Sequence, residues 1–190
     1  MMIGIIKRNF KYLEKDAFIN LYKAMVRSHL EYAVSVWSPR YKKDIEIVEK
    51  IQRRATKLVR ECKGKPYKDR LRYLNLPTLK YRRLRGDMLE TYKILNDIYD
   101  NEAAPVLELS GTRMTRGNDK KLNKVMCKTD LRRHFFTQRV VDVWNSLPSE
   151  IINSASVNIF KNKLDKFWQT QEIYFDYKAD IAGTGSRSWI

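Results

Sequence analysis

The sequence predicts a mainly α fold, in which an antiparallel helical bundle is followed by an irregular connecting loop and a small C-terminal helical subdomain. Three observations lead to this prediction. Apolar residues recur every three or four positions along most of the chain, as on one face of a helix. The 7 glycines and 5 prolines among 190 residues are too few for a turn-rich β sandwich. Hydrophobic residues make up 43% of the chain, which is enough to bury a core.

Two helices are predicted in the first third of the chain. The first runs from Lys15 to Trp37 and ends at Ser38, because a residue that precedes proline avoids the α region. The second, from Lys42 to Cys62, has acidic residues in its first turns and basic residues in its last turns, as the helix dipole favours. Its apolar seam alternates steps of three and four and consists of Val48, Ile51, Ala55, Leu58 and Cys62.

Two further helices complete the predicted bundle, which we assign to residues 1–100. A short helix covers Tyr67–Leu74, where leucines recur at helical spacing. A long helix opens after Pro77, and its apolar residues keep a helical period almost to residue 100. Thr78 is its expected N-cap, because a threonine hydroxyl can accept a hydrogen bond from an amide of the first turn.

The remainder of the chain divides into three predicted parts. Residues 101–130 are expected to be a loop or linker, since helical periodicity fades there and loop-forming residues gather around Arg116–Gly117. Residues 131–170 are expected to form an aromatic-rich helical subdomain, and residues 171–190 a frayed tail. The aromatic side chains expected to pack as the core of that subdomain are Phe135, Phe136, Trp144, Phe160, Phe167 and Trp168.

The charge of the chain points to an acidic partner. The formal net charge is +16 and the isoelectric point is about 9.8. Between Arg40 and Arg85 there are 17 lysines and arginines against 5 acidic residues, so this segment alone carries +12. Such a local excess predicts a binding surface, for which nucleic acid is the commonest partner and an anionic membrane the next.

Two groups of cations are the candidate nucleic-acid-binding residues. The first lies on the predicted second helix, opposite its apolar seam, and its alternative interpretation is an ordinary solvated helix face. It consists of Lys50, Arg53, Arg54, Lys57 and Arg60. The second occupies the first turns of the long helix, where the helix dipole disfavours cations, so a phosphate backbone is expected to select them. It consists of Lys80, Arg82, Arg83 and Arg85.

Three tyrosines alternate with these cations, and two interpretations of them stay open. They are Tyr67, Tyr73 and Tyr81. Their rings could stack on nucleobases, as aromatic side chains do in proteins that bind single strands. They could equally be amphipathic residues at the rim of the core, with the ring buried and the hydroxyl in water.

No pattern in the sequence predicts a metal site, a cofactor or a catalytic centre. The cysteines Cys62 and Cys127 and the histidines His29 and His134 do not have the paired spacing of a zinc site. No paired aspartates suited to two-metal chemistry are present. No apolar run reaches the length of a membrane span, and the two cysteines imply no disulfide framework, so we expect an intracellular protein in the nucleus or the cytoplasm.

Several stretches, taken together and in order, resemble the region downstream of the palm in jockey-like non-LTR (LINE-type) retrotransposon reverse transcriptases. Each stretch is weak alone, but together they extend over some 150 residues. They are LYKAMVRSHLEYAVSVWSP at 21–39, IQRRATK at 51–57, LRGD at 84–87 with YKIL at 92–95, RG at 116–117, RVVDVWNSLP at 139–148 and FKNKL at 160–164.

This resemblance implies a thumb-like helical module with a C-terminal extension. In that family the region grips the template–primer duplex and contacts the element's RNA, while the palm upstream carries a Tyr/Phe-x-Asp-Asp-type motif that binds the catalytic metals. The sequence contains no such motif. The resemblance therefore implies a non-catalytic, nucleic-acid-binding fragment of an RNA-directed DNA polymerase. Ser28 stands where the family has proline, which predicts a straighter helix there.

Two alternatives to nucleic-acid binding stay open at this point. The chain could be a protein-interaction or scaffold module, in which the apolar seams pair with a palm domain or with a second copy of the chain. It could also be the non-functional remnant of a decayed element. A role at a membrane surface is less favoured, because the basic helices lack the bulky exposed aromatic face that interfacial binding requires.

Overall fold

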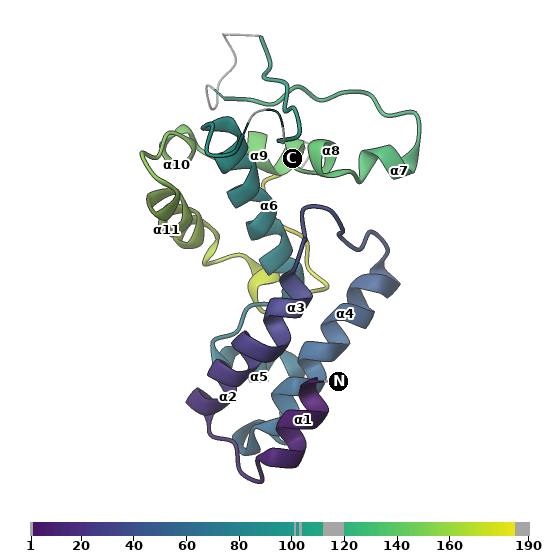
Figure 1. Ribbon diagram of the computed structural model, residues 1–190, viewed down its shortest axis with the longest axis vertical. Coiled ribbons are helices and arrows are strands. Elements are labelled where there is room, and N and C mark those ends of the chain that lie inside the picture. Colours follow the sequence, from purple (N-terminus) through teal and green to yellow (C-terminus); the bar gives the residue numbers. More distant parts are fainter. Residues whose placement is uncertain (1, 101, 103, 112–119, 185–190) are drawn as a thin grey trace. The chain divides into compact units, whose positions relative to one another are not determined.

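The computed structural model describes residues 2–100, 102, 104–111 and 120–184, and it is mainly helical over this part of the chain (Figure 1). The predicted fold class is therefore confirmed. The β structure of the described residues is a single antiparallel bridge between Leu109 and Leu122. The Arg116–Gly117 stretch and the end of the predicted tail lie outside the described residues.

The chain forms two compact units, and the boundary between them falls within a helix. The first unit comprises the described residues up to Arg83 together with Glu172–Asp180, and the second comprises Leu84–Gln171 and the described residues after Asp180. These limits differ from the predicted divisions at residues 100, 130 and 170. The reason is that the long helix α6 (Leu79–Leu95) contributes residues to both units.

Part of the predicted frayed tail belongs to the core of the first unit. Glu172–Tyr174 forms a 3₁₀ turn, η4, and Ile173 is fully buried. The amide of Thr78 donates a hydrogen bond to the carbonyl of Tyr174 at 2.8 Å, and the Thr78 hydroxyl donates to the carbonyl of Ile173 at 2.6 Å. The same hydroxyl accepts from the amide of Tyr81 at 3.1 Å, so the predicted N-cap of the long helix is confirmed.

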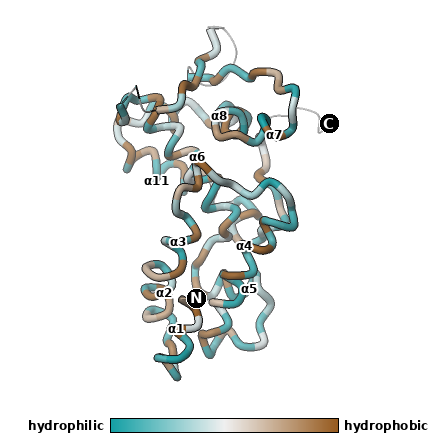
Figure 2. The backbone as a smooth tube through the Cα atoms, turned by 45° about the vertical axis from the view of Figure 1, so that its right-hand side comes forward, coloured by the Kyte–Doolittle hydropathy of each residue, from teal (hydrophilic) through white to brown (hydrophobic). Residues whose placement is uncertain are grey.

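The first unit is built from short helices and helical turns. In chain order they are α1 (Met2–Asn9), α2 (Lys15–Leu21), the π-helical η1 (Tyr22–Arg27), α3 (Ser28–Glu31), α4 (Lys42–Ala55), the 3₁₀ turns η2 (Thr56–Leu58) and η3 (Arg60–Cys62), α5 (Tyr67–Leu74) and the start of α6. Phe18 and Tyr22 stack at the centre of its core, with ring centroids 5.6 Å apart. Figure 2 shows apolar and polar residues alternating along these helices, which lets each one bury a single face.

The first predicted helix is shorter than the sequence analysis proposed. It runs through α2, η1 and α3 to Glu31, because Tyr32 is extended (ψ 132°) and Ala33 has a positive φ of 50°. A non-glycine residue in this left-handed region cannot continue an α helix. Residues 32–41 therefore form a connecting segment, and the prediction of a helix up to Trp37 is wrong.

The second predicted helix also ends early, and its buried face is polar. α4 stops at Ala55, since two 3₁₀ turns follow and Val59 between them is extended, with its side chain fully buried. The residues of α4 and η2 that are fully buried include Glu49, Gln52 and Thr56. The predicted apolar seam is only partly right, because Val48, Ile51 and Leu58 remain half-buried.

The second unit contains the later part of α6 and a set of short helices. They are α7 (Asp130–Arg133), α8 (Phe136–Arg139), α9 (Val141–Asn145), α10 (Ser149–Ile152) and α11 (Val157–Trp168), which Ser156 caps as predicted. Its aromatic core is centred on Phe160, whose ring centroid lies 4.4 Å from that of Tyr92 and 6.0 Å from that of Trp144. The Trp144 indole N–H donates to the Lys120 carbonyl at 2.8 Å, so this buried polar group is satisfied.

Four of the six aromatic residues predicted for this core are buried there: Phe136, Trp144, Phe160 and Trp168. The other two predictions are wrong, since Phe135 is 51% exposed and Phe167 is 44% exposed. Phe167 directly precedes Trp168 on α11, where neighbouring positions point about 100° apart, and Phe135 is the extended residue before α8, which begins at Phe136. Only one member of each pair can face the core. Among the described helices, none has the length and apolarity needed to cross a membrane.

Candidate nucleic-acid interface

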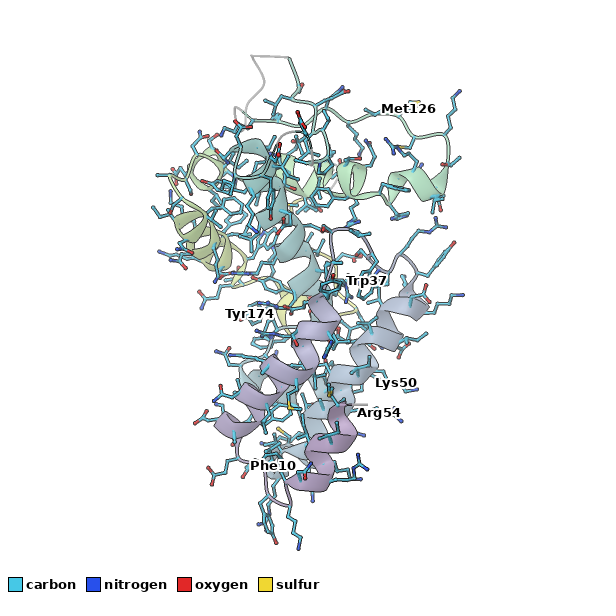
Figure 3. All side chains as sticks on the ribbon, in the orientation of Figure 1. Phe10, Trp37, Lys50, Arg54, Met126 and Tyr174 are labelled. Carbon is cyan, nitrogen blue, oxygen red and sulfur yellow. The ribbon has the colours of Figure 1, made fainter. Side chains whose placement is uncertain are left out.

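Four of the predicted cations form an exposed group on the first unit, which we call the basic surface: Lys50, Arg54, Lys57 and Arg60. Lys50 and Arg54 are one turn apart on α4, and Figure 3 shows both side chains extending from the helix to the same side. Lys57 and Arg60 follow in η2 and η3. None of the four makes an ion pair or a hydrogen bond through its side chain with the described part of the chain. Their charges therefore face solvent.

Arg53, the fifth cation predicted for this helix, contacts the first unit itself. Its Nη2 donates a hydrogen bond to the hydroxyl of Tyr177 at 2.6 Å. Its guanidinium carbon lies 5.4 Å from the ring centroids of both Tyr67 and Tyr177, within the range of a cation–π interaction. A carboxylate oxygen of Glu46 lies 3.8 Å from Nη1 of Arg53. Arg53 thus holds the segment after residue 171 against α4.

The cations at the start of α6 pair with carboxylates from distant parts of the chain. Both carboxylate oxygens of Glu31 accept hydrogen bonds from Arg82, at 2.7 and 2.6 Å. The ammonium of Lys80 lies 2.6 Å from an Asp180 carboxylate oxygen and 2.8 Å from the Ala179 carbonyl oxygen. In the second unit, Arg85 makes a similar two-bond contact with Asp165, at 2.5 and 2.8 Å.

Arg83, the remaining cation of this group, is 5% exposed. Its positive charge is among the influences that lower the pKa of Glu49. The structure therefore gives a different reason for cations in the first turns of α6 from the one predicted. Carboxylates within the protein offset the unfavourable interaction between these cations and the dipole of α6. Lys50 and Arg54 lie together on one side of α4, and the group of Lys80, Arg82, Arg83 and Arg85 is not part of the basic surface.

A buried polar network lies behind the basic surface, and the sequence analysis did not find it. Glu49 is fully buried on α4, where its carboxylate accepts a hydrogen bond from the Tyr67 hydroxyl at 2.6 Å and from the Leu79 amide at 3.1 Å. Burial raises the pKa of Glu49, while these hydrogen bonds and the charge of Arg83 act in the opposite direction. The carboxylate thus joins α4 to the N-terminus of α6.

Gln52 connects this carboxylate to the rest of the core. Its side-chain oxygen accepts a hydrogen bond from the Tyr22 hydroxyl at 2.5 Å, and its nitrogen donates to the Tyr67 hydroxyl at 3.1 Å and the Pro77 carbonyl at 3.0 Å. Burial raises the pKa of Tyr22 and of Tyr67. Both phenols therefore act as hydrogen-bond donors, and the network is a structural link between helices. The one sequence feature that points to this network is the spacing of Glu49 and Gln52, which lie three positions apart and therefore on one side of α4.

The three tyrosines for which two interpretations stayed open have different positions. Tyr67 is half-buried in this network, and Tyr81 is 2% exposed beside Tyr174, with ring centroids 4.7 Å apart. Both pack within the protein, although the hydroxyl of each is enclosed and does not face water as the core-rim interpretation has it. Tyr73 is 37% exposed, and the ammonium groups of Lys15 and Lys65 lie 5.2 and 4.6 Å from its ring centroid.

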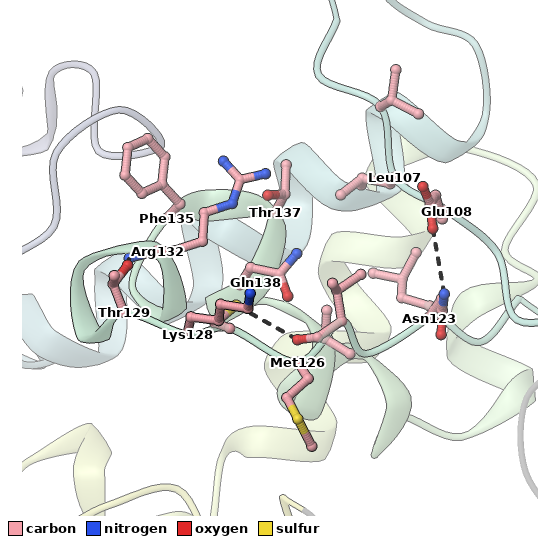
Figure 4. Close-up of a pocket in the computed structure, with 15 residues that line it drawn as sticks. Leu107, Glu108, Asn123, Met126, Lys128, Thr129, Arg132, Phe135, Thr137 and Gln138 are labelled. Atoms are coloured by element: carbon pink, nitrogen blue, oxygen red, sulfur yellow. Dashed lines mark hydrogen bonds between the residues drawn. The ribbon is translucent and has the colours of Figure 1, made fainter.

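A second candidate surface is a groove of about 640 Å³ in the second unit (Figure 4). Extended residues 106–108 and 122–129 form one part of its lining, and residues around α7 and α8 form another. Two of its lining residues are joined by a hydrogen bond, which Asn123 donates to Glu108 at 3.3 Å (Figure 4). Among its lining residues, the apolar side chains of Val106 and Met126 are 80% and 95% exposed.

The described residues contain no group of three His, Cys, Asp or Glu side chains placed to hold a metal ion. Comparison of the chain with models of protein families, with curated proteins and with solved structures found no match. The interpretation of the site thus depends on its own geometry and charge.

Proposed function

We propose that this chain binds RNA or an RNA–DNA duplex through phosphate contacts made by Lys50, Arg54, Lys57 and Arg60. The observation that carries the proposal is that these four cations are exposed and have no ionic partner among the described residues. Cations elsewhere in the same fold, such as Arg82 and Arg85, are neutralised by carboxylates. An exposed cation that no carboxylate neutralises can displace the counterions of a nucleic acid, which is the main source of sequence-independent affinity.

The proposal includes the origin that the sequence motifs suggest. We propose that the chain is the non-catalytic thumb and C-terminal extension of a jockey-like non-LTR retrotransposon reverse transcriptase, whose polymerising palm is a separate part. A net charge of +16 and a helical fold support this assignment. In this role the chain would hold template and primer, and a palm domain would supply the catalytic metals.

The test is the salt dependence of binding. A fluorescently labelled 20-base-pair RNA–DNA duplex is titrated with the chain at several salt concentrations, and binding is followed by anisotropy. Four phosphate contacts predict a slope of log K against log salt of about −2.8 to −3.6, from −0.7 to −0.9 per contact. Replacing the four cations by glutamine (K50Q/R54Q/K57Q/R60Q) is expected to shallow the slope and weaken binding at low salt.

The matched control removes the same charge elsewhere. Lys23, Lys128, Lys161 and Lys166 are exposed and make no side-chain ion pair with the described residues. The K23Q/K128Q/K161Q/K166Q variant has the same net charge of +12 as the test variant, four less than +16. The slope of log K against log salt for this control is expected to stay close to that of the unmodified chain. Equal slopes in the two variants would mean that net charge, and not the basic surface, drives binding, and would reject the proposal.

A second candidate function is association with protein, and one observation favours it. The groove of the second unit carries exposed apolar side chains, including Val106, Met126 and Phe135 (51% exposed). Such a surface could contact a palm domain or a second copy of the chain. Sizing the purified chain at low and high salt separates the two functions. Self-association that persists in high salt, without salt-sensitive RNA binding, would favour this candidate.

A further inference from the structure

The segment Tyr32–Tyr41, between α3 and α4, carries three exposed aromatic side chains, and we call it the aromatic loop. Tyr32 is 77% exposed, Trp37 39% and Tyr41 52%. The segment also contains Arg40, and Lys42 and Lys43 follow it at the start of α4. We propose that this loop binds unpaired nucleobases by stacking, next to the phosphate-binding basic surface of the same unit. The inference rests on the proposed function and adds the class of ligand that the loop recognises.

Trp37 has a fixed orientation that suits stacking. Its backbone amide donates to the Ala33 carbonyl at 3.1 Å, and its indole N–H donates to the Tyr32 carbonyl at 2.7 Å. The only polar group of the indole is thus satisfied inside the loop, and what the ring offers to solvent is its apolar surface. A ring that is already ordered loses little conformational entropy when a base packs against it.

Tyr32, whose backbone carbonyl accepts that hydrogen bond, provides a second exposed ring on the loop. Its side chain makes no hydrogen bond, ion pair or ring contact with the described residues. An aromatic side chain exposed to this extent gains from any contact that removes its face from water. Every nucleobase is flat and has a π face, so stacking does not depend on sequence. Stacking on an aromatic side chain is worth about 1–3 kcal/mol per base, or roughly five- to 150-fold in affinity.

The charge around the loop favours nucleic acid over an apolar protein partner. The guanidinium of Arg40 lies 4.3 Å from the Tyr41 ring centroid, and the ammonium of Lys43 lies 5.6 Å from it. A basic environment attracts phosphates and repels a second copy of this basic chain. From Tyr41 the exposed cations Lys50 and Arg54 follow along α4, about 14–20 Å away at 1.5 Å per residue. One strand could therefore contact both the loop and the basic surface.

The test compares a single strand with the same strand lacking its bases. A 12-nucleotide oligoadenylate and an abasic 12-mer carry the same phosphates, and a blunt 20-base-pair RNA–DNA duplex offers no unpaired bases along its length. The full chain is expected to bind the oligoadenylate about ten-fold more tightly than the abasic strand, as one or two stacked bases would give. Tyr32→Ala is expected to remove most of this difference and leave duplex binding unchanged, whereas Tyr32→Phe keeps it.

A second readout reports on Trp37 itself. Oligoadenylate is expected to quench tryptophan fluorescence in a chain that carries Trp189→Phe and much less in Trp37→Phe/Trp189→Phe, since the two other tryptophans, Trp144 and Trp168, are buried. Tyr12→Ala is the matched control, because Tyr12 is 79% exposed on the same unit but lies outside the loop. It is expected to change neither measurement.

The possible outcomes distinguish this inference from the proposed function. Equal affinity for the oligoadenylate and the abasic strand, with a salt slope that still depends on the basic surface, overturns the stacking loop alone. The stacking loop is also overturned if Tyr32→Ala weakens binding to all three probes equally. The same holds if Tyr32→Ala changes the self-association of the chain and leaves binding to the probes unchanged. Binding to none of the probes overturns both proposals.

Discussion

Arg82 binds Glu31 through two hydrogen bonds, at 2.7 and 2.6 Å, although the two residues lie 51 positions apart in the chain. Their side chains are 23% and 24% exposed, so the pair is shielded from much of the solvent. It joins the start of α6 to the end of the α2–η1–α3 helix. A cation that the helix dipole disfavours is thereby turned into a contact that holds the first unit together.

The first prediction follows from this pair. Arg82→Gln and Glu31→Gln are each expected to destabilise the chain by about 1–3 kcal/mol, with a coupling energy of about 1 kcal/mol in the double mutant, because a two-bond arginine–carboxylate contact is lost. Urea denaturation of the four proteins measures this. The exposed pair Asp69–Arg72, 3.2 Å apart, is the control and is expected to couple by less than about 0.5 kcal/mol. A coupling no larger than that of the control would contradict the prediction.

The second prediction concerns Glu49, whose pKa is raised by burial. The folded chain holds this proton more tightly than the unfolded chain does, so the contribution of Glu49 to stability is full below the ordinary pKa of 4.5 and is lost as pH rises through the folded-state value. The difference in unfolding free energy between the unmodified chain and Glu49→Gln is therefore expected to shift in favour of the variant as pH rises above 4.5.

Denaturation of both proteins at a series of pH values measures this difference. Glutamine can still accept hydrogen bonds from Leu79 and Tyr67, so the fold is expected to survive the substitution. Glu14→Gln removes an exposed carboxylate without a side-chain cap hydrogen bond and is the matched control for the substitution. A difference that shifts the other way with pH would show that the carboxylate is stabilised as an anion.

The third prediction concerns Ala33, which has a φ of 50° and lies two residues after the end of α3. Alanine is strained in this left-handed region and glycine is not. Ala33→Gly is expected to stabilise the chain by up to about 1 kcal/mol, after the larger entropy of glycine in the unfolded chain is taken into account. The control is Ala17→Gly, at an exposed position inside α2, which is expected to destabilise by about 1 kcal/mol. Thermal denaturation measures both changes in stability. If both substitutions stabilise the chain, or both destabilise it, the prediction is refuted.

Local sequence patterns predicted the features that depend on neighbouring residues. The helical class, the N-caps Thr78 and Ser156 and the burial of Trp144 and Phe160 all follow from periodicity or from a capping residue next to its helix. These features need no knowledge of what lies across the fold. The same reasoning placed Lys50, Arg53 and Arg54 on one side of α4, yet Arg53 contacts Tyr67 and Tyr177 within the first unit.

The features that the sequence analysis missed depend on partners distant in the chain. Lys80 meets Asp180 from 100 positions away, and Arg85 meets Asp165 from 80. Acidic and basic residues near helix ends look the same in sequence whether they face water, a phosphate or a carboxylate. In the sequence, Glu49 is one of several acidic residues in the first turns of its helix, yet in the fold it is buried among hydroxyl and amide donors. Periodicity reports which face is apolar and does not report which polar group will be enclosed.

The fourth prediction concerns Arg139 and Asp87, the most buried ion pair of the second unit among those described. Their side chains are 14% and 4% exposed, and two hydrogen bonds of 2.8 and 2.9 Å join them. Arg139→Met removes the cation and leaves the Asp87 carboxylate enclosed, so a loss of about 3–5 kcal/mol is expected. Near-ultraviolet circular dichroism during urea denaturation, which reports on Trp144 in the same unit, measures it.

Two further variants separate the loss of the pair from the loss of arginine packing. Adding Asp87→Asn to Arg139→Met removes the enclosed charge, and it is expected to restore part of the lost stability because the amide is cheaper to bury than the carboxylate. Arg133→Met is the matched control, since its side chain is 67% exposed and lies 3.6 Å from Asp130. Its expected effect is below about 0.5 kcal/mol. If the double variant is no more stable than Arg139→Met alone, Asp87 is not the residue that makes Arg139 necessary.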